Sequence, residues 1–449
     1  MKINHLFAAT LCVGLLAVSL ASQATVTTQE LERLNKDLTP TGAEKAGNKD
    51  GSIPSWDGGL SVNPAGTEGK GIYADPFSAD KPLFTITAAN MAQYQSKLSA
   101  GQMELLKRYP GYKMEVYPSR RSFALPATEY RNIKAEAADA ALVDGGSGLT
   151  NTKTTTAPFP LPKNGMEVMW NHILRYRGGR VTRQSSLFPV QSNGSFTPVV
   201  RIENFAAASA LKAPEANRLY YYMVGDIAPA SLAGSATLAI QPLNQVKEPN
   251  LIWIYNPGSR RVIRASDVGY DAPAAAADGL ATVDNYDGFT GAMDRYDWKL
   301  VGKKEMIVSY NNQRLLGKDV KPKDLVRPGH MNQDLVRYEP HRVWVVEATL
   351  KGGKRHLYAK RVFYIDEDSW QIAHADMFDG RGELWRVHEM HAVEVYDAQV
   401  MTAACDVLYD LQSRRYLISG LVNAAKPLKF GVPLEVGDFS IDALRRFAN

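Results

Sequence analysis

Strand-like segments dominate the second half of the chain. Between residues 342 and 396, short runs that alternate apolar and polar residues are separated by turn residues, at Gly352-Gly353, Asp366-Glu367-Asp368 and Asp379-Gly380. This spacing is typical of a meander of antiparallel strands. A wide antiparallel sheet with large apolar side chains on one face must cover that face. The cover is helices, a second sheet or an apolar ligand.

Further strands are predicted on both sides of this meander, at residues 198–204, 218–224, 235–243, 251–255, 261–265, 298–300, 305–310 and 407–417. The turn Asn256-Pro257-Gly258-Ser259 favours a hairpin between two of them. In segments 251–255 and 343–350 every second residue is apolar, and most of these residues are large. We therefore expect each of these strands to bury one face and to expose the other to water.

Helical signals lie mainly in the first third of the chain. Thr27 with Glu30, and Ser99 with Gln102, have the spacing of capping boxes, and residues 127–143 and 441–447 also favour helix. The sharpest pattern follows residue 165. Its apolar residues recur at helical spacing and precede the stop signal Gly178-Gly179; they are Met166, Met169, Trp170, Ile173 and Leu174.

A Thr- and Pro-rich connector at residues 151–165 is the best candidate for a domain boundary. It predicts a helical and loop region at residues 25–160 and a β-rich region at residues 161–449. Residues 1–24 have the features of a secretory signal peptide: Lys2, an apolar run from Leu6 to Leu20, and small residues at Ser22 and Ala24. The run is short for a membrane span, so no integral membrane segment is expected after cleavage.

Composition narrows the class of function further. Cleavage would leave Cys405 as the only cysteine, so the exported chain is expected to rely on its core rather than on disulfides. A formal net charge of +5 is small for 449 residues and gives no case for binding nucleic acid.

Candidate catalytic and metal-binding motifs are weak. His388 and His391 lack the spacing of a zinc protease and, three apart on a strand, face opposite sides. The acidic run at residues 284–288 lacks the ligand order of a calcium loop and favours a surface turn. Asp366-Glu367-Asp368 is interpreted as a solvated turn. We predict no catalytic residue, metal or cofactor, although an enzyme with an unfamiliar mechanism stays open.

The large apolar side chains offer a different kind of site. We predict that a partly covered sheet leaves an apolar cavity and that six residues line it: Met169, Trp170, Trp253, Tyr255, Trp344 and Val346. Met suits this role because it adapts to irregular apolar shapes. The alternative is that these residues form an ordinary core under helices.

Five blocks of sequence resemble a Gram-negative periplasmic family of outer membrane lipoprotein-sorting proteins, similar to LolA and LolB. They are LTPTGAEKAGNKDGSIPSWDGG at 38–59, the block 165–178 with NHILRYRG at its core, RYDWKLVGKKEMIVSYNN at 295–312, RVFYIDEDSW at 361–370 and YDLQSRRYLISGL at 409–421. Arg414 stands where the resemblance leads us to expect glycine, a departure that concerns a turn. The family offers no known binding residues to carry over.

The resemblance implies an α+β fold: a large antiparallel sheet curled as an incomplete barrel with helices on its concave side, plus the N-terminal helical and loop region. It implies a periplasmic carrier or adaptor for a lipid or other hydrophobic molecule, working with an RND-type transporter and an outer-membrane β-barrel partner. Two alternatives remain: an accessory protein that docks on a transporter or barrel without carrying a ligand, and a hydrolase acting on lipids or polymers.

Overall fold

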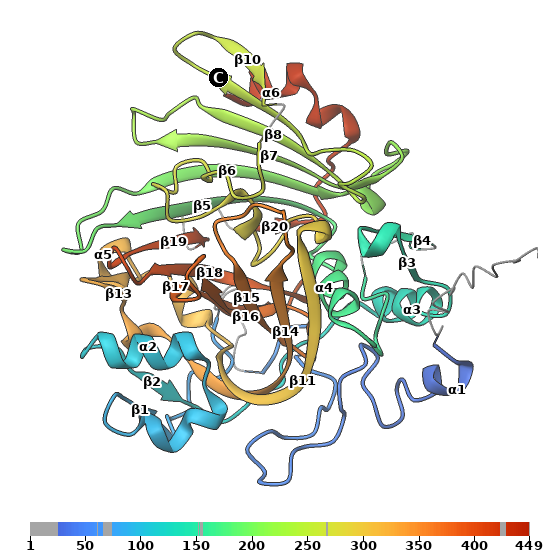
Figure 1. The fold of residues 1–449 in the computed structure, drawn as a ribbon, viewed down its shortest axis with the longest axis vertical. Coiled ribbons are helices and arrows are strands. Elements are labelled where there is room, and N and C mark those ends of the chain that lie inside the picture. The colour runs from blue at the N-terminus through green and yellow to red at the C-terminus, as the bar shows by residue number, and fades with distance from the viewer. Residues whose placement is uncertain are drawn as a thin grey trace, which may run out of the picture.

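The computed structural model describes residues 26–60, 62–65, 74–150, 152, 156–265, 268–422 and 428–448. The predicted signal peptide lies outside these residues. A sheet of 16 strands forms most of the molecule (Figure 1). Its main path runs β11-β14-β15-β16-β17-β18-β19-β5-β6-β7-β8-β9-β10, with antiparallel pairing throughout. β11 and β10 form its two edges, so the predicted open antiparallel sheet is confirmed.

The strands of the large sheet are β1 (Phe84–Ile86), β2 (Met114–Val116), β5 (Arg180–Val190), β6 (Val199–Ala207), β7 (Arg218–Ala228), β8 (Ala236–Pro242), β9 (Leu251–Asn256), β10 (Arg261–Arg264), β11 (Tyr296–Ser309), β14 (Tyr338–Leu350), β15 (Lys360–Asp366), β16 (Ile372–Phe378), β17 (Leu384–Val395), β18 (Val400–Asp410), β19 (Arg415–Leu421) and β20 (Lys429–Phe430). Two small sheets pair β3 (Ala141–Val143) with β4 (Gly148–Thr150) and β12 (Val326–Arg327) with β13 (His330–Met331). The α-helices are α1 (Thr28–Leu31), α2 (Ala100–Arg108), α3 (Ala127–Glu136), α4 (Gly165–Leu174), α5 (Pro322–Leu325) and α6 (Ile441–Ala448).

The large sheet is strongly curled. Val346 on β14 and Phe205 on β6 belong to one buried cluster, although seven strand-to-strand steps separate these strands in the sheet. At about 4.8 Å a step, a flat sheet would hold them roughly 34 Å apart. The face that carries both residues must therefore be concave. Beyond the end of β11 the Asn312 amide also donates to the carbonyl of Ala392 on β17 at 3.0 Å, so the curl almost closes there.

Helix α4 fills one part of the concave face. Asn164 caps it by accepting from the Glu167 amide, and the buried residues Val168, Met169 and Trp170 face the core. Gly165 lets its first turn approach the sheet closely, since a Cβ there would lie 3.1 Å from the Val346 side chain. The predicted helix on the concave side is thus confirmed.

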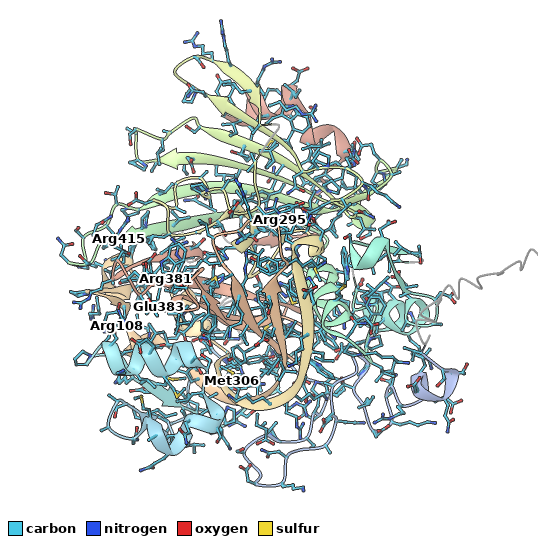
Figure 2. All side chains as sticks on the ribbon, viewed as in Figure 1. Arg108, Arg295, Met306, Arg381, Glu383 and Arg415 are labelled. Carbon is cyan, nitrogen blue, oxygen red and sulfur yellow. The ribbon has the colours of Figure 1, made fainter. Side chains whose placement is uncertain are left out.

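Other helices cover the convex face. α2 begins with the predicted capping box of Ser99 and Gln102 and packs against β16 and β17. α6 packs against β7, β8 and β9. The central strands are consequently buried on both faces: on β11, Met306 (labelled in Figure 2) joins the concave cluster and Ile307 the convex one. The expectation of one wet face is wrong for β14, where Val343 and Val346 are both fully buried.

Several element boundaries differ from the sequence-based expectation. The two short strands predicted at 298–300 and 305–310 are one strand, β11, with an irregularity at Gly302. The strand predicted at 407–417 is divided between β18 and β19 by a turn. The predicted helix at 127–143 ends at Glu136 and is followed by β3. Among the described residues, no helix has the length and apolarity needed to cross a membrane.

Buried ion pairs attach the N-terminal segment to the turn between β15 and β16. Arg121 donates to both carboxylate oxygens of Asp368, at 2.6 and 2.9 Å, and to the carbonyl of Glu44 at 2.8 Å. The Trp370 indole donates to the carbonyl of Thr41 at 3.0 Å. Asp366, Glu367 and Asp368 are therefore buried, and their interpretation as a solvated turn is wrong. The domain boundary near residue 160 stays a prediction.

Replacing Arg121 with Gln is expected to lower the free energy of unfolding by about 3 kcal/mol, because it leaves the buried Asp368 carboxylate without its charged partner. The matched control is Arg120→Gln, whose half-exposed side chain pairs with Asp80, with an expected loss of no more than about 1 kcal/mol. Urea unfolding followed by tryptophan fluorescence measures both. Equal losses in the two variants would contradict the proposed anchoring role.

Arg414 in the turn between β18 and β19 adopts φ +58°, a left-handed conformation that favours glycine. Arg414→Gly is expected to raise the free energy of unfolding by about 1 kcal/mol. Ser413→Gly is the control, because Ser413 has no positive φ. In thermal denaturation Ser413→Gly should not raise the stability of the protein. An increase in stability equal to that of Arg414→Gly would contradict the strain argument.

Candidate functional site

A cavity of about 200 Å³ lies on the concave face. Strands β5–β7 form one wall and β17–β19 form the other. The segment of residues 272–288, which we call the roof loop, covers it. Its apolar lining includes Val181, Leu187, Phe205, Met390, Val400, Leu408, Leu417, Leu428 and Phe430. Its polar lining includes Arg177, Arg183, Arg201, Glu203, Tyr222, Tyr286, Asp287, Thr402, Asp406 and Ser419.

The roof loop is held down by charged contacts. Arg201 on β6 donates to the Ala275 carbonyl at 2.9 Å, and Arg415 on β19, labelled in Figure 2, pairs with Asp278. At its other end Asp284 pairs with Arg361 of β15 at 2.6 Å. Residues 284–288 are thus built into the protein rather than forming the predicted surface turn, and an arginine already holds the Asp284 carboxylate.

A polar row crosses the cavity wall formed by β5, β6 and β7. Glu203 accepts from Arg183 at 2.8 Å and from the Tyr222 hydroxyl at 2.7 Å, and it also accepts from Ser185. Burial alone would raise the pKa of Glu203, but the adjacent Arg183 cation and these hydrogen bonds outweigh it and lower the pKa. The row is therefore a charged, hydrogen-bonded belt in a cavity surface that is polar and apolar in similar measure.

Two arginines pair with one carboxylate of the roof loop. Arg175 and Arg177 donate to separate oxygens of Asp287, at 2.6 and 2.8 Å. They oppose the effect of burial and hold the pKa of Asp287 well below its usual range. Burial, reinforced by Arg175, lowers the pKa of His172 to about 3. His172 is accordingly neutral, and its Nδ1 accepts from the Ile372 amide at 3.2 Å.

Tyr286 carries a hydroxyl that makes no hydrogen bond to any described residue, although its ring lies 5.3 Å from that of Tyr222. Burial raises the pKa of Tyr286 strongly, against the opposing influence of Arg183 and Arg177. This side chain lines the cavity as a neutral donor and acceptor.

The six residues predicted to bind ligand fall into two groups. Met169, Trp170, Trp344 and Val346 lie in or against the concave core, where α4 fills the space over β14. Trp253 and Tyr255 pack on the convex face with α6. The lining of the cavity includes none of the six, and their assignment as ligand-binding residues stays a prediction.

The residues that line the cavity had no recognisable motif. Arg183 and Glu203 pair across neighbouring strands, but β5 did not emerge from the sequence as a strand. The available signal was the presence of charged residues among the alternate positions that face the core. These positions are Val181, Arg183, Ser185 and Leu187 on β5, and Arg201, Glu203 and Phe205 on β6.

His388 and His391 have different partners. His388 Nε2 lies 2.8 Å from Asp406, and His391 Nδ1 lies 2.6 Å from the Ser309 hydroxyl. Burial, with His388 nearby, lowers the pKa of His391 to about 3. The two imidazoles do not share a site.

The fold does bring a serine, a histidine and an aspartate together, which the sequence did not predict. Ser99 and Asp376 both contact the Nε2 atom of His374, each at 2.8 Å. A catalytic triad needs the serine and the acid on different ring nitrogens. All three side chains are buried and none lines the cavity, so the group caps α2 and does not form a nucleophilic site.

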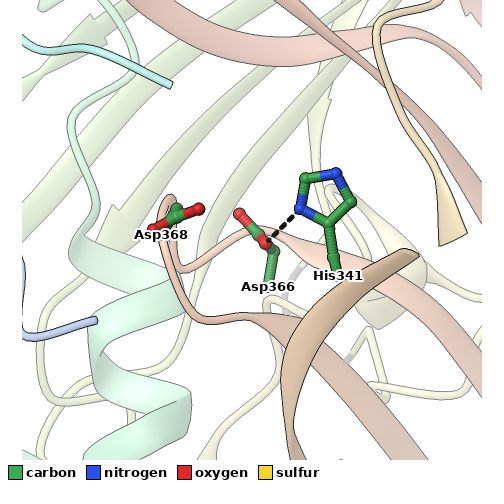
Figure 3. A group of neighbouring side chains, drawn as sticks. All are labelled: His341, Asp366 and Asp368. Carbon is green, nitrogen blue, oxygen red and sulfur yellow. Dashed lines mark ion pairs between the residues drawn. The ribbon is translucent and has the colours of Figure 1, made fainter. Parts of the chain in front are cut away.

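A second buried group consists of His341, Asp366 and Asp368, whose nearest ligand atoms lie within 4.8 Å of one another (Figure 3). One imidazole and two carboxylates suit a divalent cation. However, Arg121 already occupies both oxygens of Asp368. Burial would lower the pKa of His341, but Glu339 and Asp366 outweigh it and raise the pKa. The guanidinium therefore supplies the positive charge that a metal would bring.

The fold and the cavity define a class: an open, curled antiparallel sheet with an internal, partly charged binding space. The chain belongs to the family described as "Protein of unknown function (DUF1329)", whose model matches residues 85–445. It is 50% identical over 442 residues to the uncharacterized protein PA3922 of Pseudomonas aeruginosa, covering 96% of this chain and 97% of that one.

Among solved structures, an outer membrane lipoprotein-sorting protein domain from Vibrio parahaemolyticus has 16% identity and a TM-score of 0.43, covering 63% of this chain and 98% of that chain. A DUF1329 family protein from Desulfovibrio piger has 14% identity and a TM-score of 0.42, with coverages of 60% and 92%. A LolA superfamily protein from Nitrosomonas europaea has 12% identity and a TM-score of 0.39, with coverages of 63% and 100%.

Burying neutral His172 and His391 makes stability depend on pH. Each has a pKa near 3 in the folded state and about 6.5 when unfolded, so the unfolded chain binds more protons between these values. Stability is expected to fall as pH drops below about 6.5, by up to about 1.4 kcal/mol per pH unit for each histidine. His172→Asn should flatten this dependence in urea unfolding between pH 4 and 7. An unchanged slope would contradict the assignment.

Proposed function

We propose that the protein is a periplasmic binding protein that holds the hydrophobic part of a ligand in the cavity on its concave face and performs no chemistry on it. The supporting observation is the cavity itself, which apolar side chains from β5, β6, β17 and β18 line on both sides of a charged belt. A binding protein needs no nucleophile.

The size of the cavity limits the ligand. A cavity of roughly 150 Å³ accepts a benzene ring, so about 200 Å³ holds a small amphiphile or part of one acyl chain. A lipid anchor with several chains needs more room. An open groove shares Leu428 and Phe430 with the cavity, and a longer tail would extend along it.

A carrier of this kind avoids the free-energy cost of exposing an apolar chain to water. Moving a chain of 16 methylenes into water costs roughly 13 kcal/mol at about 0.8 kcal/mol each. Free diffusion of such a molecule between membranes is negligible, and a protein cavity replaces water with apolar contacts. An RND-type transporter and an outer-membrane β-barrel are the partners we propose for delivery or release.

The second candidate is an accessory protein that docks on such a partner. The observation that favours it is the exposed edge at β10, where Ile263 lies directly opposite Ile254 of β9 and both are exposed, at 60% and 44%. Helix α4 fills the space over β14, and this also fits an accessory protein that carries no ligand.

Ala403→Phe tests the carrier. Ala403 lines the cavity, so a benzyl group there is expected to fill it and to reduce ligand recovery at least about tenfold while the protein stays folded. The protein is purified from the periplasm and extracted with organic solvent, and the extract is analysed by mass spectrometry.

The matched control is Ala135→Phe on the exposed side of α3, which should leave ligand recovery unchanged. The carrier proposal falls if neither the wild type nor the control yields a stoichiometric apolar compound and if neither binds an added ten-carbon amphiphile. Capture of a membrane partner by the same proteins would then support the accessory role.

A further inference from the structure

We infer that the ligand is an anionic amphiphile with a single chain, and that its carboxylate or phosphate group binds between Arg177, Arg183 and Tyr286. This inference rests on the proposed function and specifies the ligand class of the same cavity. It concerns the polar end of the ligand, whereas the proposed function concerns the apolar part.

The first argument is the charge beside the cavity. Arg175, Arg177 and Arg183 bring three permanent cations to this end, but their partners Asp287 and Glu203 supply only two carboxylates. His172 is neutral and does not change the sum. One positive charge is left in a mostly buried setting, where an unpaired charge is costly and a bound anion is correspondingly favoured.

The second argument is the set of free hydrogen-bond donors. Arg177 uses one guanidinium nitrogen on Asp287, and Arg183 uses one on Glu203. Their other nitrogens make no hydrogen bond to a described residue and are not fully buried. The Tyr286 hydroxyl has no partner among the described residues. Fork-shaped guanidinium groups that keep donors available match the paired oxygens of a carboxylate or phosphate.

Other charged groups of the lining are already paired. Arg201 donates to Asp226 at 2.8 Å and to the roof loop. Asp406, on the opposite wall, contacts His388 at 2.8 Å. The arginine that lacks a carboxylate of its own thus lies on the side of Arg177 and Arg183, and the Asp406 carboxylate lies on the opposite wall.

The apolar lining provides a place for the tail. Val181 and Phe205 form the next row of the same wall, in register with each other across β5 and β6. Leu428 and Phe430 lie on this side and also border the open groove. Arg177 covers the Phe205 ring at 4.6 Å and so lies where the charged and apolar regions meet. A head group at Arg183 would direct its tail along this row toward the groove.

Isothermal titration calorimetry with decanoate, decyl phosphate and 1-decanol tests the inference on the full-length processed protein. Decanoate or decyl phosphate is expected to bind at least about tenfold more tightly than 1-decanol, because charge-assisted hydrogen bonds are stronger than those between neutral groups. Whichever anion binds more tightly identifies a carboxylate or a phosphate as the natural head group. Inorganic phosphate alone should bind weakly, since it lacks the tail.

Arg177→Gln is the main variant, because Asp287 keeps Arg175 as its partner. It is expected to reduce the preference for the anion over 1-decanol to less than about threefold, and Tyr286→Phe should weaken anion binding without affecting 1-decanol. Arg261→Gln, on the exposed edge strand β10, is the control and should change neither affinity.

The outcomes separate the two proposals. Equal binding of decanoate, decyl phosphate and 1-decanol overturns the anionic head group and leaves the carrier standing. Binding of none of the three, in a protein whose unfolding curve is normal, overturns both. An anion preference that survives in both Arg177→Gln and Tyr286→Phe overturns the assignment of the head-group site.

Discussion

The curl of the large sheet is the constraint on which the rest of the structure depends. Bringing β14 and β6 to one core creates an inner face that the strands cannot fill with their own side chains. Protein interiors pack to high density, so this space needs other material. Helix α4 supplies it over β11 and β14, and the roof loop covers the part over β5–β7 and β17–β19. The cavity is the volume that neither element reaches.

Arginine paired with carboxylate is the means by which irregular segments are held to this sheet. Arg121 with Asp368, Arg361 with Asp284, and Arg175 with Asp287 each join parts of the chain that are distant in sequence. These pairs are buried, so breaking one leaves an uncompensated charge, and the segments are fixed in one arrangement. At Arg177 and Arg183 the arginines outnumber the carboxylates, and there we propose that the remaining donors bind the head group of a ligand.

Sequence patterns were sufficient for elements with strong local signals. The caps at Thr27 and Ser99 and the apolar spacing of α4 arise within a few residues, and the structure has the helices there. The strands of the meander were also recognisable. The cavity was not, because its lining depends on pairing between β5 and β19, which no local pattern encodes. Trp253 and Trp344 have equally large side chains, and only the curl of the sheet decides that they face opposite sides.

The pairing of β5 with β19 also has a consequence for how the protein is made. These strands come from distant parts of the chain, and such contacts form late because a long loop must close first. Until β19 arrives, β5 presents an unpaired edge open to wrong partners. The cavity spans this junction, with Arg183 and Glu203 on one side and Asp406 and Ser419 on the other. The complete cavity therefore exists only in a chain that has finished folding, and under the proposed function an unfinished molecule would carry no ligand.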